Sequence, residues 1–142
     1  MKTILFADDN RNIREYCRAS FEDQGYRVLL ARDGFEAFQV FSAEVPDLVI
    51  LDISMPRASG LETLERIRGL APDVPVILFT ANDEDCLRDR RATLATACVG
   101  KSEDLSELLR VVQRAFRAVV AEDRSGPVRI GLPPLYSETS GS

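Results

Sequence analysis

The sequence predicts a doubly wound α/β fold, in which helices cover both faces of a parallel five-stranded sheet. Strand-like and helix-like segments alternate from Thr3 to about Ala121, giving five strand–helix units. The strand-like segments are near-continuous apolar runs, as expected where strands are buried on both faces. A length of 142 residues, with 45% apolar and 29% charged residues, suits one globular domain with its own core. We therefore expect a three-layer sandwich with the sheet in the middle.

Turn and capping residues divide the chain into its predicted elements. Gly25 ends the first helix as a left-handed cap, and Pro46 ends the second. Asp33 and Glu36 have the spacing of a capping box at the start of the second helix, and Ser102 can cap the last one. The strands are expected at residues 3–7, 26–30, 47–51, 75–79 and 96–99, and the helices at about 10–24, 34–45, 59–70, 83–94 and 103–121. The stripe of the last helix comprises Leu105, Leu108, Leu109, Val112 and Phe116.

The composition changes near residue 121. Gly, Pro and Ser become frequent, as in Ser125-Gly126-Pro127, and such segments rarely form a packed core. We predict a folded domain over residues 1–121 and a flexible C-terminal tail over residues 122–142. An alternative for part of the tail is a short docking motif formed by Leu132, Leu135 and Tyr136.

The net charge and the cysteine content exclude several classes of binding site and partner. The net charge of −5 argues against direct contact with nucleic acid, which needs a basic face. Cys17, Cys86 and Cys98 are odd in number with no close pair, and the chain has no histidine, so we expect neither disulfides nor a zinc site. A reduced, cytoplasmic setting follows as the expectation. No apolar run reaches the roughly 18 residues of a membrane span, and a signal peptide is not expected.

Four predicted strands are followed by functional polar groups. Asp8-Asp9 follow the first strand, Asp52 the third, Thr80 the fourth and Lys101 the fifth. The carboxyl ends of parallel strands share one edge of the sheet, and ligands of doubly wound folds bind there. Clustered carboxylates are unfavourable without a cation, so the pattern predicts a Mg²⁺ and phosphoryl site. Asp52 can act as a nucleophile toward phosphorus, and Lys101 can neutralise the charge that develops on the phosphoryl oxygens.

These motifs, together with Ser54-Met55-Pro56 after Asp52 and Ala81 after Thr80, resemble the receiver domain of bacterial two-component response regulators. The resemblance covers residues 2 to about 120 and implies a flavodoxin-like sheet of order 2-1-3-4-5. It implies that Asp52 accepts a phosphoryl group from a histidine kinase or phosphotransfer protein, and that Thr80 and Lys101 contact the phosphoryl oxygens. The implied Mg²⁺ ligands are the side chains of Asp8, Asp9 and Asp52, Asp8 mainly through metal-bound water, and the backbone carbonyl of Ser54.

The resemblance also implies partners and a setting. Phosphorylation would change the conformation seen by a downstream protein target, and a homodimer could form through the face from helix 4 to helix 5. Neither direct nucleic acid contact nor membrane contact is implied, and the domain would be cytoplasmic. It would catalyse only its own phosphorylation and slow dephosphorylation, so it would not be an enzyme in the metabolic sense.

The sequence departs from the family pattern on the output side. Cys98 occupies a position that is usually aromatic, Ser102 replaces the usual proline after the lysine, and Leu94 stands where glycine is usual. The departures at Cys98 and Ser102 leave open an alternative function, a phosphorylation-independent scaffold that binds proteins through a receiver-like fold.

Two further alternatives are less well supported. A phosphohydrolase of the haloacid dehalogenase type would need a second Asp at Ser54, and a nucleotide site would need a Gly-rich loop after the first strand. Taken singly, each group has a simpler explanation. Asp9 could be a helix cap, and Asp52 could begin a turn before Pro56. The Thr80 hydroxyl could bond to local backbone, and Lys101 could be a solvated surface charge. Four such coincidences at strand ends make the joint site the better interpretation.

Overall fold

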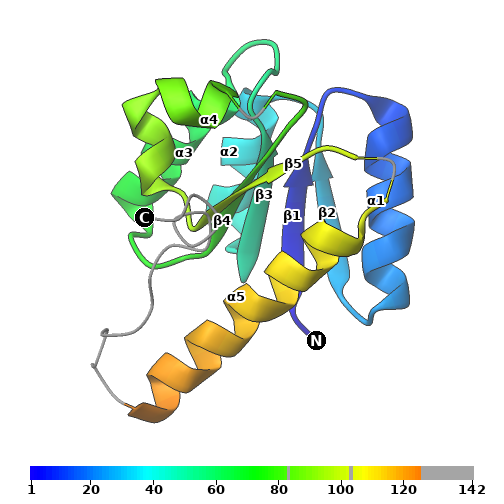
Figure 1. Cartoon of the computed structure of the whole chain (residues 1–142), viewed down its shortest axis with the longest axis vertical. Helices are drawn as coiled ribbons and strands as arrows, with labels where there is room; N and C mark the ends of the chain where they lie inside the picture. Colours follow the sequence, from blue (N-terminus) through cyan, green and yellow to red (C-terminus); the bar gives the residue numbers. More distant parts are fainter. Residues whose placement is uncertain (83, 103, 126–142) are drawn as a thin grey trace.

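The computed structural model describes residues 1–82, 84–102 and 104–125. Its sheet contains five parallel strands in the order β2-β1-β3-β4-β5, as predicted (Figure 1). Each strand except β1 begins one residue later than expected. The strands are β1 (Thr3–Ala7), β2 (Arg27–Ala31), β3 (Leu48–Asp52), β4 (Val76–Thr80) and β5 (Ala97–Gly100).

Helices cover both faces of this sheet, which confirms the three-layer architecture. The helices are α1 (Arg11–Asp23), α2 (Gly34–Glu44), α3 (Gly60–Leu70), α4 (Glu84–Arg88), the 3-10 helix η1 (Arg90–Leu94) and α5 (Ser106–Ser125). Ile4, Phe6 and their neighbours pack against α1 and α5, whereas Leu5, Ala7 and theirs pack against α2, α3 and η1. Alternate residues of each strand therefore supply the two halves of the core.

Side-chain caps fix the starts of the first three helices. Asn10 accepts a hydrogen bond from the Ile13 amide, and Asp33 accepts one from the Glu36 amide at 2.7 Å. Asp33 is the N-cap of α2, as predicted, but the reciprocal half of the capping box is wrong, because the Glu36 carboxylate accepts from the Arg32 amide, one residue before the cap. The complete capping box lies instead at α3 and joins Ser59 to Glu62.

Two glycines allow the third helix to approach its neighbours closely. A Cβ on Gly34 would overlap the carbonyl group of Ala58, and one on Gly60 would overlap that of Asp52. Both contacts are with backbone, which cannot rotate away as a flexible side chain can. Gly34 thus lets the start of α2 lie against the β3–α3 connection, and Gly60 lets the start of α3 lie against the end of β3.

The C-terminal third departs most from the predicted boundaries. The single helix expected at 83–94 is two short pieces, α4 and η1. Ser102 does not cap α5, because its hydroxyl donates to the Asp104 carbonyl and the helix begins at Ser106. Helix α5 continues to Ser125, into the segment predicted as tail, and the suggested docking motif lies outside the described residues. Among the described residues, no helix is both long and apolar enough to cross a membrane.

Candidate functional site

The predicted site residues come together at the carboxyl-terminal edge of the sheet. Asp8 directly follows β1, Asp52 and Thr80 end β3 and β4, and Lys101 directly follows β5. These four strands are consecutive neighbours in the sheet. Carboxylate oxygens of Asp8, Asp9 and Asp52 all lie within 4.8 Å of one another. Asp8 and Asp52 are buried, whereas Asp9 is exposed.

Lys101 places one positive charge against the buried carboxylates. Its Nζ atom lies 2.8 Å from Asp8 Oδ2 and 3.2 Å from Asp52 Oδ2. The Lys101 amide donates to the Thr80 carbonyl at 2.7 Å, which fixes the base of the side chain beside β4. Burial alone would lower the pKa of Lys101, but the hydrogen bond and charge of Asp8 and the charge of Asp52 outweigh it and raise the pKa. The ammonium form is therefore retained in the site.

The surroundings of Asp52 disfavour its charged form. Burial, followed by the charge of Asp8, raises the pKa of Asp52 from 3.8 to about 6. Lys101 and the Ser54 amide, which donates to Asp52 Oδ1 at 3.2 Å, oppose the rise without cancelling it. An additional cation beside Asp52 would favour its ionised form.

The donor set fits a divalent metal ion. Asp8 Oδ2 is fully buried, and it shares the single Lys101 ammonium with Asp52. A buried acceptor in that state, close to two further carboxylates, suits a hard cation that takes oxygen ligands. The carbonyl of Ser54 as a ligand stays a prediction.

Thr80 ends β4 at the same edge of the sheet, and its hydroxyl forms hydrogen bonds on the side of α4. Thr80 Oγ1 accepts a hydrogen bond from the Asn82 amide at 3.1 Å. It lies 3.1 Å from the Asn82 carbonyl and 3.3 Å from Asp85 Oδ2, the two acceptors available to its single proton. We call these hydrogen bonds of Thr80 with Asn82 and Asp85 the Thr80 latch. Asp85 was missed in the sequence because nothing in its spacing distinguishes it from other acidic residues of a helix.

The structure corrects the prediction that the cysteines are unpaired. Cys86 on α4 and Cys98 on β5 form a disulfide, and among the described residues only Cys17 is a free, buried cysteine. Cys98 is therefore not simply a small packing residue. The separation of 12 residues gives no sign of this pair in the sequence, because the fold, not the spacing, brings the two together.

Asp52→Asn is expected to stabilise the metal-free protein at pH 7.5. Because the pKa of Asp52 is raised to about 6, the folded chain holds a proton that the unfolded chain loses between about pH 4 and pH 6. Wild-type stability therefore falls as pH rises through that window. Asparagine avoids this loss, so the variant should be about 1–2 kcal/mol more stable at pH 7.5 and gain little near pH 4.

Thermal unfolding in a chelator at several pH values measures this difference. Asp23→Asn, at the exposed end of α1, is the matched control and should show no such pH dependence. An equal effect of Asp52→Asn at both pH values would contradict the assignment.

Comparison with known proteins identifies similar chains. The family model described as "Response regulator receiver domain" matches residues 4–113. The response regulator MprA of Mycobacterium tuberculosis is 38% identical over 123 residues, covering 84% of this chain and 53% of that protein. MprA of Mycobacterium avium is 37% identical over 135 residues, covering 93% and 58%. The chain thus spans about half the length of the curated relatives it matches.

Solved structures share the fold as well. The response regulator TrrA from Thermotoga maritima, in complex with Mg²⁺–BeF, aligns with a TM-score of 0.77 and 40% identity, covering 81% of this chain and 99% of that one. TrrA in complex with the histidine kinase ThkA aligns with a TM-score of 0.74 and 38% identity, covering 81% and 98%.

Proposed function

Because this chain belongs to the response regulator receiver family, we propose that it is a phosphorylation-dependent signalling receiver in a two-component phosphorelay. Asp52 accepts a phosphoryl group from a histidine kinase, and the domain transmits the change to a partner protein. The observation that carries this proposal is the buried Asp52 carboxylate, 3.2 Å from the Lys101 ammonium and grouped with Asp8 and Asp9.

The chemistry is a transfer of phosphorus to a carboxylate oxygen. An Asp52 oxygen attacks phosphorus in line, and the bond to the phosphohistidine nitrogen breaks with its electron pair leaving on the imidazole. Lys101 neutralises charge on the transferred oxygens. Asp8, Asp9 and Asp52, with the Ser54 carbonyl, would hold Mg²⁺, which supplies electrostatic stabilisation of the same oxygens. TrrA bound to Mg²⁺–BeF supports this ligand chemistry by analogy.

Thr80 connects the site to the output face. To donate to a phosphoryl oxygen, its hydroxyl must give up its hydrogen bond to Asn82 or Asp85. Phosphorylation therefore competes with the Thr80 latch and favours a rearrangement near α4. The domain is a signalling domain, and we propose that it catalyses only its own phosphorylation and slow dephosphorylation.

The proposed partners follow from the family. They are a histidine kinase or phosphotransfer protein and a downstream protein target, and the complex of ThkA with TrrA supports the first. We also propose a cytoplasmic setting, a receiver domain over residues 1–121, and homodimer formation through the α4 to α5 face. Direct contact with nucleic acid or membrane is not proposed for this domain.

Incubation of the reduced chain with acetyl phosphate and Mg²⁺ tests the proposal. Intact-mass measurement should show one added phosphoryl group on the wild type and on Asp23→Asn. It should show none on Asp52→Asn, because the acceptor oxygen is lost, and little when the metal is chelated. An unmodified wild type, or a modified Asp52→Asn, would rule out Asp52 as the acceptor.

A phosphorylation-independent scaffold is the second candidate. The Cys86–Cys98 disulfide favours it, because a covalent bond restrains the segment that must move in a switch. In that case Asp52→Asn would leave partner binding unchanged, whereas the first proposal expects it to abolish the effect of phosphorylation on that binding.

A further inference from the structure

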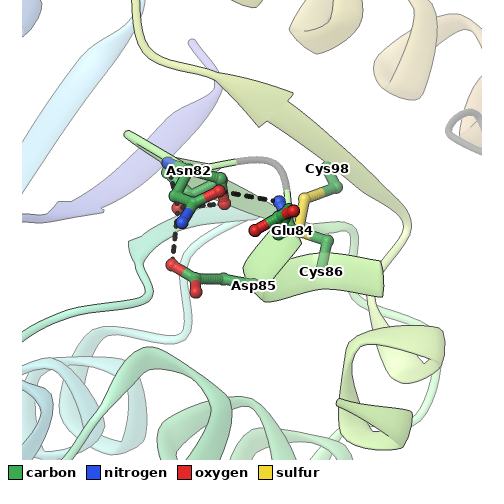
Figure 2. Close-up of a disulfide and its surroundings, with 6 residues drawn as sticks. Asn82, Glu84, Asp85, Cys86 and Cys98 are labelled. Carbon is green, nitrogen blue, oxygen red and sulfur yellow. Dashed lines mark hydrogen bonds between the residues drawn. A yellow bond between two sulfur atoms is a disulfide. The ribbon is translucent and has the colours of Figure 1, made fainter. Parts of the chain in front are cut away.

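The disulfide joins the shortest α-helix of the domain to the sheet. Helix α4 has five residues and none of them is buried, so apolar packing does little to hold it. Cys86 on this helix is bonded to Cys98 on β5, with the two Cα atoms 6.8 Å apart (Figure 2). On β5, Cys98 pairs with Leu78 of β4, two residues before Thr80. The bond therefore fixes α4 beside the end of β4.

The residue next to the disulfide forms part of the Thr80 latch. Asp85 directly precedes Cys86, and its Oδ2 lies 3.3 Å from the Thr80 hydroxyl. Figure 2 shows Asp85 and Asn82 facing one another beside the disulfide, and the Glu84 amide donates to Asn82 Oδ1 at 3.0 Å. The Asp85 amide also donates to the Asn82 carbonyl at 3.0 Å. The position of Asp85 is therefore set by this bond near the end of β4 and by the disulfide at the next residue.

We propose that the Cys86–Cys98 pair is a thiol–disulfide modification site that controls the Thr80 latch. In the disulfide form, α4 is held so that Asp85 and Asn82 retain the Thr80 hydroxyl. In the dithiol form α4 is free to move away, and the hydroxyl becomes available to a phosphoryl group on Asp52. The inference rests on the proposed function of the site, because the phosphoryl group is the competitor for Thr80.

The chemical step is reversible thiol–disulfide exchange. A thiolate of a dithiol reductant attacks one sulfur, the Cys86–Cys98 bond breaks, and the second thiol of the reductant resolves the mixed disulfide. Two electrons pass to the pair, each cysteine ends as a protonated thiol, and the reductant leaves as its own disulfide. A disulfide oxidant reverses the step.

The surroundings of the cysteines suit this role. Cys86 and Cys98 are both partly exposed, so a reductant can approach them. Cys17 is fully buried, and burial, helped by the charge of Asp8, raises its pKa to about 12, so it does not compete in the exchange. Disulfides in cytoplasmic proteins are most often transient and redox-sensing, which matches the setting proposed for this domain.

The experiment compares the full chain in oxidised and reduced forms, with thiol alkylation and intact mass to verify each state. Acetyl phosphate with Mg²⁺ should phosphorylate the reduced form about tenfold faster than the oxidised form. This factor corresponds to the free energy of one hydrogen bond to a charged group. Hydrogen exchange gives a readout that needs no phosphorylation. The Asn82 amide, which donates to Thr80, should be protected in the oxidised form and exchange faster after reduction, with β3 unchanged.

Further variants distinguish an effect on the Thr80 latch from a general change in stability. The double variant Cys86→Ser/Cys98→Ser should be phosphorylated as fast as the reduced wild type. Its rate should not depend on the redox buffer. Asp85→Ala removes the acceptor of the Thr80 hydroxyl and should raise the rate of the oxidised form. Glu84→Ala, which removes a side chain paired with Arg88 on the exposed side of α4, should keep the full redox response.

The outcomes distinguish the two proposals. Equal rates and equal Asn82 exchange in verified oxidised and reduced forms would overturn the redox control but leave Asp52 as the acceptor. Failure to form the disulfide under oxidant would also overturn it. Absence of phosphorylation in both forms, with Asn82 exchange still redox-dependent, would instead overturn the proposed function.

Discussion

Gly60→Ala is expected to be among the most damaging single substitutions in the domain. A Cβ at this position would overlap the Asp52 carbonyl oxygen and lie 2.9 Å from Ile53 Cα. The Gly60 amide also donates to the Ile53 carbonyl at 2.9 Å, so the helix cannot retreat without losing that bond. We expect a loss of about 3 kcal/mol in the free energy of unfolding, or about 10 °C in Tm. Displacement of Asp52 should slow phosphorylation as well.

Gly69→Ala is the matched control within the same helix. A Cβ at Gly69 would meet nothing within 4 Å, so alanine should raise stability by about 0.5–1 kcal/mol through its better helix propensity. Urea unfolding followed by circular dichroism measures both variants. Similar stability changes in the two would show that helix propensity, and not the contact with β3, decides the effect.

The apolar runs were enough to predict the sheet and three of its converging groups. The central strands β3 and β4 are buried along their whole length, so each is apolar up to the charged or hydroxyl residue that ends it. The edge at which Asp8, Asp52 and Lys101 meet then follows from parallel pairing and sheet order. Helix boundaries near Gly25 and Pro46 could be predicted because these residues restrict the backbone locally.

The features that could not be predicted depend on contacts across the chain. Gly60 resembles any glycine in a loop until β3 is placed against it. The side chain of Asp85 has no preferred partner until α4 is positioned beside Thr80. The sequence predicts no Cys86–Cys98 disulfide, because the two residues lack the close spacing of a typical pair. Whether two cysteines pair depends instead on which elements lie side by side in the fold. The helix expected at 83–94 was wrong because periodicity does not show where a weak helix breaks.

Lys101→Met should produce a second large effect, with opposite signs for metal binding and for phosphorylation. Lys101 is the positive charge within 3.2 Å of both Asp8 and Asp52. Methionine keeps much of the volume but leaves buried carboxylates uncompensated, at a cost of about 3 kcal/mol in metal-free protein at pH 8. Mg²⁺ should bind more tightly to the variant and restore more stability than in the wild type. Phosphorylation should nevertheless slow by about 100-fold, because one donor to the transferred oxygens is lost.

The pH dependence of Lys101→Met adds an internal check. Lys101 lowers the pKa of Asp52, which burial has raised to about 6, so its removal raises that pKa further. The folded variant then binds a proton that the unfolded chain has released, and its stability falls as pH rises above about 4. The destabilisation should thus be smallest near pH 5 and largest at pH 8. Lys2→Met, which removes the chain's other lysine from an exposed position, should change stability by less than about 1 kcal/mol and leave Mg²⁺ binding unaltered. Weaker Mg²⁺ binding by Lys101→Met would mean that the ammonium does not oppose a cation in this site.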